Sequence, residues 1–116
     1  MTASARIRRR FLVERIPVRF VAEGAESVGY LKNVSRAGLF IRSEDLPRPG
    51  CPLAVQFESP EGGLVNLLGE ARWRTSDLMN PDVPPGFGVQ IHEPPRPYRD
   101  FFLWAAEQAE KEPEGE

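Results

Sequence analysis

Two groups of residues in this 116-residue chain have side chains that suit ligand binding. One is an arginine-rich stretch near the N-terminus, made of Arg6, Arg8, Arg9, Arg10 and Arg15. The other is the segment 33–38, with the sequence Asn-Val-Ser-Arg-Ala-Gly, which lies between two apolar stretches. A guanidinium presents a planar fork of donors, and the short side chains of Asn33 and Ser35 both donate and accept hydrogen bonds. These residue types favour ligand binding over bond-breaking chemistry.

Patterns typical of enzymes and metal sites are missing from the sequence. The motifs Gly-x-Ser-x-Gly, His-Glu-x-x-His and Ser-x-x-Lys do not occur, and there is no Walker phosphate-binding loop. One histidine, His92, and one cysteine, Cys51, cannot build a zinc site or an intramolecular disulfide. Ser35 has no neighbouring base in the sequence, because His92 follows 57 positions later. We therefore expect a protein that is not an enzyme and that needs no metal or cofactor.

Charge is distributed unevenly along the chain. The sum is −2, but residues 1–20 carry a local net charge of +5 and residues 105–116 one of −4. The negative sum, and the lack of a basic, aromatic-rich face on the expected strands, argue against nucleic acid as a partner. No apolar run approaches the ~18 residues that span a membrane, and none follows the N-terminal charges as in a signal peptide. We therefore expect a cytoplasmic protein without membrane insertion.

The apolar pattern predicts an all-β domain with one helix. From Ile16 onward, short alternating stretches are separated by glycine, proline and acidic turns, which is typical of antiparallel strands. The expected strands cover 16–21, 27–32, 37–42, 53–57, 65–75 and 86–93, and a helix covers about 99–111. This succession predicts a small six-stranded antiparallel β-barrel with a C-terminal α-helix. The expected regions are a flexible basic arm (1–14), the barrel domain with its helix (15–111) and a disordered acidic tail (112–116).

Other apolar and reactive residues have simpler expected roles in such a fold. Trp73 lies on the apolar face of its strand and is expected in the core, and Trp104 is expected to dock the helix. These roles are favoured over a stacking platform for a ligand. The segment 11–13 is expected to latch onto the barrel, although it could instead contact a partner. We expect Cys51 to be a loop thiol and His92 to be exposed on a strand.

The segment 33–38 resembles the second motif of the PilZ domain family, Asp/Asn-x-Ser-x-x-Gly, which leads into a strand such as Leu-Phe-Ile at 39–41. The resemblance extends over roughly residues 8–93, with Arg-Ile-Pro-Val at 15–18 in the first strand and Gly-Phe-Gly-Val at 86–89 in the last. It implies a six-stranded β-barrel that binds cyclic di-GMP, a bacterial second messenger with two phosphates and two guanines. It also implies a first motif, Arg-x-x-x-Arg, in a basic arm before the first strand.

The resemblance places the ligand between the arm and the second motif. Arginine forks would bind phosphate or the O6/N7 edge of guanine, and the Asn33 amide and Ser35 hydroxyl would bind a base edge. Gly38 would allow a tight turn or a close approach of the ligand. The implied ligand-binding residues are Arg9, Arg10, Arg15, Asn33, Ser35 and Gly38.

The arm departs from the family pattern. With Arg15 as the second arginine of the first motif, the first arginine would fall at position 11, which is Phe11. A literal Arg-x-x-x-Arg occurs at Arg6 and Arg10, further from the first strand. Either a one-residue slip lets Arg10 act together with Arg15, or the chain no longer binds the nucleotide.

Two functions follow from the resemblance. The first is a cyclic di-GMP receptor or adaptor that signals to an unidentified protein partner, in processes such as motility. The alternative is a PilZ-fold adaptor that has lost cyclic di-GMP and acts by protein contact alone. In a simpler interpretation of the residues, Asn33 and Gly38 only cap a tight turn and the arginines form a solvated terminus. We expect a monomer or a weak homodimer.

Overall fold

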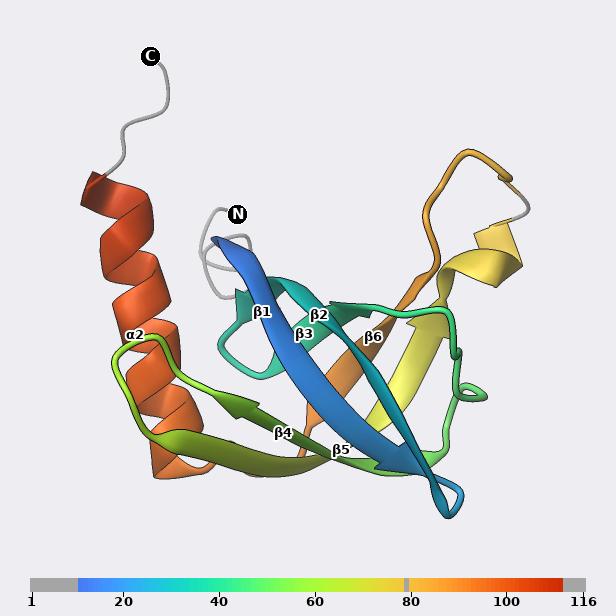
Figure 1. Cartoon of the computed structure of the whole chain (residues 1–116), viewed down its shortest axis with the longest axis horizontal. Helices are drawn as coiled ribbons and strands as arrows, with labels where there is room; N and C mark the ends of the chain where they lie inside the picture. The colour runs from blue at the N-terminus through green and yellow to red at the C-terminus, as the bar shows by residue number, and fades with distance from the viewer. Residues whose placement is uncertain (1–10, 79, 112–116) are drawn as a thin grey trace, which may run out of the picture.

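The computed structural model describes residues 11–78 and 80–111. This part of the chain forms six strands, a short 3-10 helix and one α-helix (Figure 1). The strands are β1 (Phe11–Ala22), β2 (Ala25–Ser35), β3 (Gly38–Arg42), β4 (Pro52–Glu58), β5 (Leu64–Arg74) and β6 (Gly86–Ile91). The 3-10 helix η1 covers Thr75–Leu78, and α2 covers Arg96–Lys111. No helix in the described ranges is long and apolar enough to cross a membrane.

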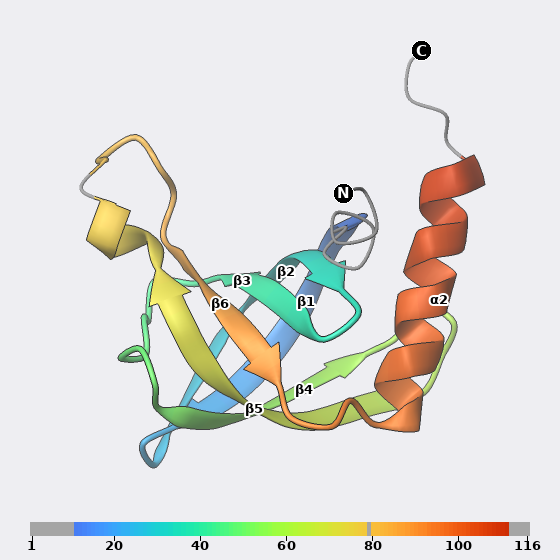
Figure 2. The ribbon, with the colours of Figure 1, turned by 180° about the vertical axis from the view of Figure 1, so that it is seen from behind.

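The six strands close into a barrel in the order β1-β2-β3-β6-β5-β4, and all neighbouring strands are antiparallel (Figure 2). The predicted six-stranded antiparallel barrel with a C-terminal helix is therefore confirmed. The first hairpin shows how local sequence supports it. Glu23 and Gly24 have φ angles of 54° and 80°, the positive values that a two-residue turn between twisted strands requires.

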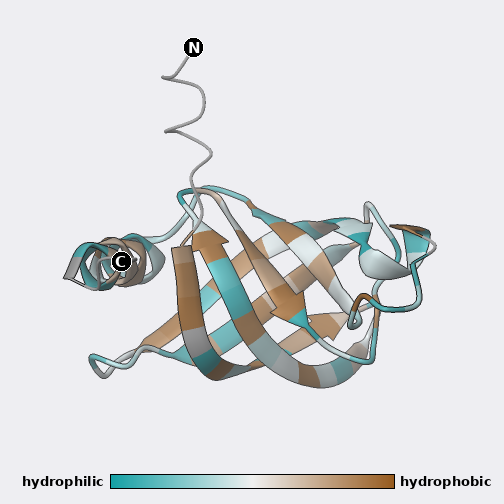
Figure 3. Cartoon of the chain, turned by 90° about the horizontal axis from the view of Figure 1, so that it is seen from above, coloured by the Kyte–Doolittle hydropathy of each residue, from teal (hydrophilic) through white to brown (hydrophobic). Residues whose placement is uncertain are grey.

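The barrel interior is filled by the alternating apolar residues that the sequence pattern predicts. Leu39 and Ile41 on β3 and Phe87 and Val89 on β6 are all buried. The rings of Phe20 and Phe87 meet edge to face across the interior, with centroids 5.0 Å apart. Figure 3 shows the alternation as brown and teal or white bands along the strands. This period of two puts every second side chain into the core.

The first strand is longer than the sequence pattern indicates. β1 begins at Phe11, so residues 11–14, expected in the arm, belong to a barrel strand. Phe11 pairs with Val34 of β2, and its ring centroid lies 5.5 Å from that of Phe102 on α2. These tertiary contacts extend the strand where local alternation is short. The remainder of the predicted arm, residues 1–10, and the predicted tail, 112–116, lie outside the described residues.

Two further element boundaries differ from the prediction. β2 continues to Ser35, three residues past its expected end at position 32, so Asn33 and Ser35 lie in a strand and not in a loop. α2 begins at Arg96, three residues before the expected start at position 99. Pro97 occupies its first turn, where the missing donor costs nothing. Pairing with a neighbouring strand and packing on the barrel extend these elements beyond their local signals.

Helix α2 lies against one end of the barrel (Figure 1). Phe101, only 1% exposed, packs edge to face on Phe57 with centroids 4.9 Å apart. Trp104 is partly buried and stacks on Phe101 at 5.9 Å. The expected role of Trp104 in docking the helix is therefore confirmed.

The single cysteine is more deeply buried than a loop thiol is expected to be. Cys51 lies just before β4, but it is 7% exposed and belongs to the hydrophobic core. Burial raises the pKa of the Cys51 thiol, because the charged thiolate would lose its hydration. The group therefore stays protonated and acts as a small apolar side chain.

Replacing Phe101 tests how far α2 supports the barrel. Phe101→Ala should lower the free energy of unfolding by about 3–5 kcal/mol, because it removes a buried ring and leaves a cavity. Leu68→Ala is the control: Leu68 of β5 is 64% exposed, and its loss should change this free energy by less than about 0.5 kcal/mol. Urea denaturation measures both. Equal effects of the two substitutions would contradict the docking of α2.

Candidate functional site

The turn between β2 and β3 is fixed by hydrogen bonds from the helix and the barrel. Ser35 ends β2 and Gly38 begins β3, and the Ser35 hydroxyl donates to the Gly38 carbonyl at 3.3 Å. The Tyr98 hydroxyl of α2 lies 2.6 Å from the Ser35 carbonyl oxygen and 3.0 Å from that of Gly38. The backbone N–H of Ile91 donates to the Ala37 carbonyl at 2.9 Å. These contacts shape the turn without help from a ligand.

Asn33 lies in β2, two residues before the turn begins. It is half-buried, and its ladder partners are Leu12 of β1 and Phe40 of β3. Gly38 lies in β3 and is not among the described glycines with positive φ. The interpretation in which Asn33 and Gly38 only cap a tight turn therefore does not account for Asn33.

A row of cross-strand neighbours extends from Asn33 across the outside of the barrel. Phe40 pairs with Asn33 on one side and with Gly88 of β6 on the other, and Gly88 pairs with Trp73 of β5. The Phe40 and Trp73 rings stack, with centroids 5.2 Å apart and planes inclined by 29°. A Cβ at Gly88 would overlap the Trp73 indole, so only glycine lets the ring lie flat on the strand. The row thus places an amide beside two stacked rings.

Trp73 is the candidate residue that the sequence pattern missed. Its position in β5 predicts a core side chain, but Trp73 is 43% exposed. The register between β5 and β6 shifts between Ala71 and Trp73, and this bulge turns the indole outward. One signal was present: the outward-facing glycines of Gly-Phe-Gly at 86–88 leave room for rings from neighbouring strands.

Two arginine side chains lie over aromatic rings near this row. The guanidinium of Arg15 is 4.8 Å from the centroid of Tyr30, and that of Arg42 is 5.4 Å from the centroid of Phe40. Arg42 also donates to the Pro84 carbonyl at 3.0 Å. Tyr30, Arg42 and Pro84 line a groove of about 480 Å³. This surface combines positive charge with aromatic faces, which suits a ligand that carries both anionic groups and rings.

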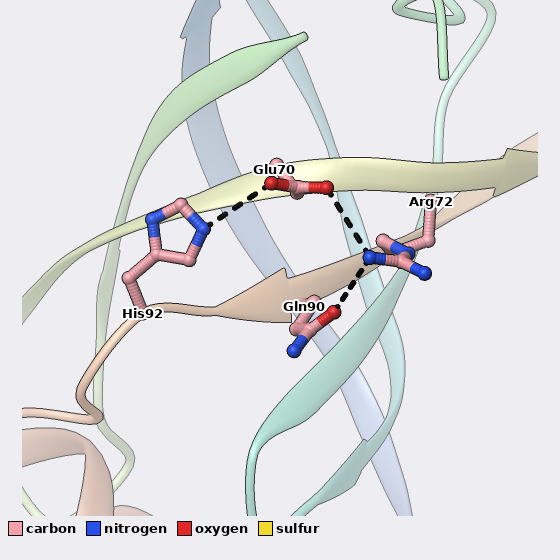
Figure 4. Close-up of polar contacts among 4 residues, drawn as sticks. All are labelled: Glu70, Arg72, Gln90 and His92. Carbon is pink, nitrogen blue, oxygen red and sulfur yellow. Dashed lines mark hydrogen bonds and ion pairs between the residues drawn. The ribbon is translucent and has the colours of Figure 1, made fainter. Parts of the chain in front are cut away.

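A polar cluster borders the turn on the β5–β6 side (Figure 4). Gln90 is the ladder partner of Gly38, and Arg72 donates to Gln90 Oε1 at 2.9 Å and to Glu70 Oε2 at 3.3 Å. The other Glu70 oxygen lies 3.4 Å from His92 Nε2. His92 is exposed, as predicted, but it follows β6 and does not lie in it. Within the described ranges, no group of three or more His, Cys, Asp or Glu side chains is placed to hold a metal ion.

Comparison with known proteins assigns the fold to a family. The sequence matches the PilZ domain over residues 5–102. The chain belongs to the PilZ domain family. The matched range includes the whole barrel and the first turns of α2. A search of curated proteins finds no match.

Two solved structures are similar to this PilZ domain. The inhibitor of motility MotI/DgrA from Bacillus subtilis has a TM-score of 0.72 at 13% identity, covering 90% of this chain and 52% of that one. The PlzA protein of Borreliella burgdorferi, solved in complex with c-di-GMP, has a TM-score of 0.62 at 16% identity, covering 84% of this chain and 39% of that one. The PilZ chain therefore spans about half or less of these proteins, and at such identities they share its fold.

The first strand of the PilZ barrel carries an irregularity just after its start. Leu12 pairs with Asn33, and the next pair joins Ile16 to Leu31. Between these pairs, three residues of β1 face a single residue of β2. Two residues of β1 therefore add no length along the ladder, as in a β-bulge.

The predicted PilZ ligand residues fall into three groups. The three residues of the second motif lie together at the β2–β3 turn. Arg15 is exposed on β1, with its guanidinium over Tyr30. Arg9 and Arg10 lie outside the described residues.

Removing one hydroxyl tests the attachment of α2 to the turn. Tyr98→Phe keeps the buried ring but leaves the two carbonyls without this donor, so the free energy of unfolding should fall by about 1–2 kcal/mol. Amide exchange at Ala37 and Gly38 should become faster. Tyr30→Phe is the control, because the Tyr30 ring is 42% exposed and its loss of a hydroxyl should be nearly neutral. Denaturation and hydrogen exchange measure both effects, and unchanged exchange at the turn in Tyr98→Phe would contradict the attachment.

Proposed function

We propose that this PilZ domain protein is a cytoplasmic receptor for cyclic di-GMP that passes the binding event to a protein partner. The observation that carries the proposal is the position of Asn33, beside the stacked rings of Phe40 and Trp73. Leu12 is the ladder partner of Asn33, so the arginine-rich segment joins the barrel next to this row. PlzA, which has the same fold, is known as a complex with c-di-GMP, and this makes that ligand the first to test.

Each part of the dinucleotide has a chemical counterpart on this surface. The Asn33 amide offers both a donor and an acceptor for the edge of a guanine. The exposed face of Trp73 suits a base, because base stacking on an aromatic side chain contributes about 1–3 kcal/mol. Arginine forks bind phosphate through two parallel hydrogen bonds. Ser35 and Gly38 hold the backbone of the turn so that Asn33 keeps its place.

The bulge in β1 supports a proposal for the arginine that acts together with Arg15. Counted along the sequence, the position four residues before Arg15 is Phe11. Because two residues of β1 add no length along the ladder, we propose that this position falls at number 9 instead, which is an arginine. In this proposal Arg9 and Arg15 form the first motif, and Arg10 adds a further cation beside them.

The proposed receptor signals through the base of its arm. Phe11, where the arm meets β1, packs against Phe102 of α2. Ligand binding draws the arginines toward Asn33 and thereby changes the surface that a partner meets at this end of α2. Coupled ordering of a segment on binding is a common basis for such signalling.

The proposal assigns no catalytic step to this surface. The Ser35 hydroxyl is bonded to the Gly38 carbonyl, and His92 lies next to Glu70. A nucleophile needs a base within hydrogen-bond distance, and these two side chains have other partners. In this proposal the protein acts by binding.

A PilZ-fold adaptor that does not bind the nucleotide is the second candidate function. It is favoured by the residue at position 11, where the family pattern has arginine. Phe11 and Val13 pack against the core, as expected if the segment 11–13 attaches to the barrel. Leu12, between them, is 73% exposed. In this alternative, the exposed Leu12 and its neighbours serve a protein contact.

Isothermal titration with cyclic di-GMP separates the two candidates. Asn33→Ala should weaken binding about tenfold or more, because the base edge loses its hydrogen-bonding partner. Asn66→Ala is the matched control, since Asn66 is an exposed asparagine of β5 whose amide oxygen accepts only a surface hydrogen bond from Gln56. Both variants should unfold at nearly the temperature of the original protein.

Either of two results would overturn the receptor proposal. If the folded protein shows no binding of cyclic di-GMP in the titration, the adaptor function replaces the receptor function. Equal binding by Asn33→Ala, Asn66→Ala and the unmodified protein would show that the ligand binds elsewhere.

Single arginine substitutions test whether Arg9 acts together with Arg15. Arg9→Ala and Arg15→Ala should each weaken cyclic di-GMP binding by about tenfold or more, because each removes a charge-assisted contact worth about 1.5–3 kcal/mol. Arg6→Ala should leave the affinity within about twofold, as for a distant screened charge. The same titration measures all three. If Arg6→Ala and Arg10→Ala were the damaging pair, the literal Arg-x-x-x-Arg would be the binding motif instead.

A further inference from the structure

The outer face of α2 carries charged residues on both sides of one exposed leucine. The members of this stripe are Arg96, Arg99, Leu103, Glu107 and Glu110, and all five are exposed. Their spacing of three and four residues keeps them on one side of the helix. The opposite side is buried against the barrel through Tyr98, Phe101, Phe102 and Ala105. Figure 3 shows α2 end-on at the edge of the molecule, with the barrel on one side of it.

The order of charges along this stripe is unfavourable for an isolated helix. Arg96 and Arg99 lie in the first turn, where the helix dipole favours negative charge, and Glu107 and Glu110 lie near the end, where it favours positive charge. Each such placement destabilises the helix when it is not compensated. The ion pair of Arg96 with Asp100, at 3.9 Å between exposed groups, compensates little.

The stripe is symmetric about Leu103 with the charge inverted. Arg96 and Glu110 are each seven positions from Leu103, and Arg99 and Glu107 are each four positions from it. Two copies of α2 that run antiparallel with Leu103 at the centre therefore place each arginine opposite a glutamate. We propose that α2 is the interface of a symmetric homodimer, formed by this antiparallel pairing of its outer face.

The antiparallel arrangement removes the unfavourable charge placement. The start of one helix lies beside the end of the other, so Arg96 faces Glu110 of the partner subunit and the two helix dipoles oppose each other. Self-complementary contact of one surface with its own copy is the rule in twofold dimers. The charged stripe extends over about 21 Å, from 14 steps of about 1.5 Å each, and the helices meet at about 8–10 Å through Leu103.

A groove beside α2 gives room for the acidic end of the partner helix. It has a volume of about 480 Å³, and Arg36, Arg96, Arg99 and Leu103 are among the residues that line it. Arg36 comes from the β2–β3 turn and adds a third cation next to the helix. One helix pair buries less surface than the roughly 1,200 Å² of a standard interface, so the dimer is reversible and weakened by salt.

Charge reversal on the stripe tests this dimer by sedimentation equilibrium at low salt. The unmodified protein should dimerise between about 10 μM and 1 mM, the range of weak complexes. Arg96→Glu/Arg99→Glu and Glu107→Arg/Glu110→Arg should each raise the dissociation constant about tenfold or more, because like charges then meet at both ends. An equimolar mixture of these two variants should form a heterodimer, because all four pairs are again opposite in sign. The variant with all four substitutions should dimerise as the unmodified protein does.

Two controls distinguish loss of a specific interface from loss of stability and from non-specific association. The first double variant puts acidic residues at the start of α2, where they stabilise the helix. Fraying of α2 would therefore not explain a loss of dimerisation in this variant. Leu103→Glu should also abolish dimerisation, whereas Leu68→Glu, at an equally exposed leucine of β5, should not. A monomer at all concentrations, a dimer that survives both double variants, or a mixture that stays monomeric would each overturn the proposal.

Discussion

The hydroxyl of Tyr98 joins the helix, the barrel and the candidate site. It lies within hydrogen-bond distance of one carbonyl at the end of β2 and one at the start of β3, and its ring is fully buried under α2. A buried carbonyl that loses its donor costs more than an ordinary hydrogen bond contributes, so this arrangement has few alternatives. The position of α2 and the shape of the turn are therefore fixed together. Asn33 lies two residues before this turn and is positioned by its pairing with Leu12 and Phe40.

Sequence alone predicted the parts of this structure that depend on a regular alternation. The period-two pattern of Leu39 and Ile41, or of Phe87 and Val89, is enough to assign strands with one buried face. The segment 33–38 and the arginines also stand out in the sequence by residue type. The order of the strands was not predicted, because β1 pairs with β4 and β3 with β6, and neither pair is consecutive in the chain.

The sequence does not reveal where the register between neighbouring strands shifts. A bulge is a property of two strands, and neither sequence reveals it alone. One register shift turns Trp73 from the expected core position to the outer face beside Phe40. Another absorbs two residues of β1, so between Leu12 and Ile16 the distance counted along the chain exceeds the distance along the ladder. The sequence likewise predicts Phe11 in the arm, because its segment is basic and short of apolar alternation, whereas Phe11 lies in β1 and packs on Phe102, a residue distant in sequence.

Closure of the barrel limits how another protein can bind to it. β1 pairs with β4 as well as with β2, so each described strand has a neighbour on both sides. Many signalling domains capture an extended peptide by adding it to a free sheet edge, where backbone groups provide the affinity. Residues 18–22 of β1 offer no such edge, because they pair with both β2 and β4. Recognition at such doubly paired stretches depends on side chains, and surface substitutions there can change the choice of partner while the ladders of the barrel stay intact.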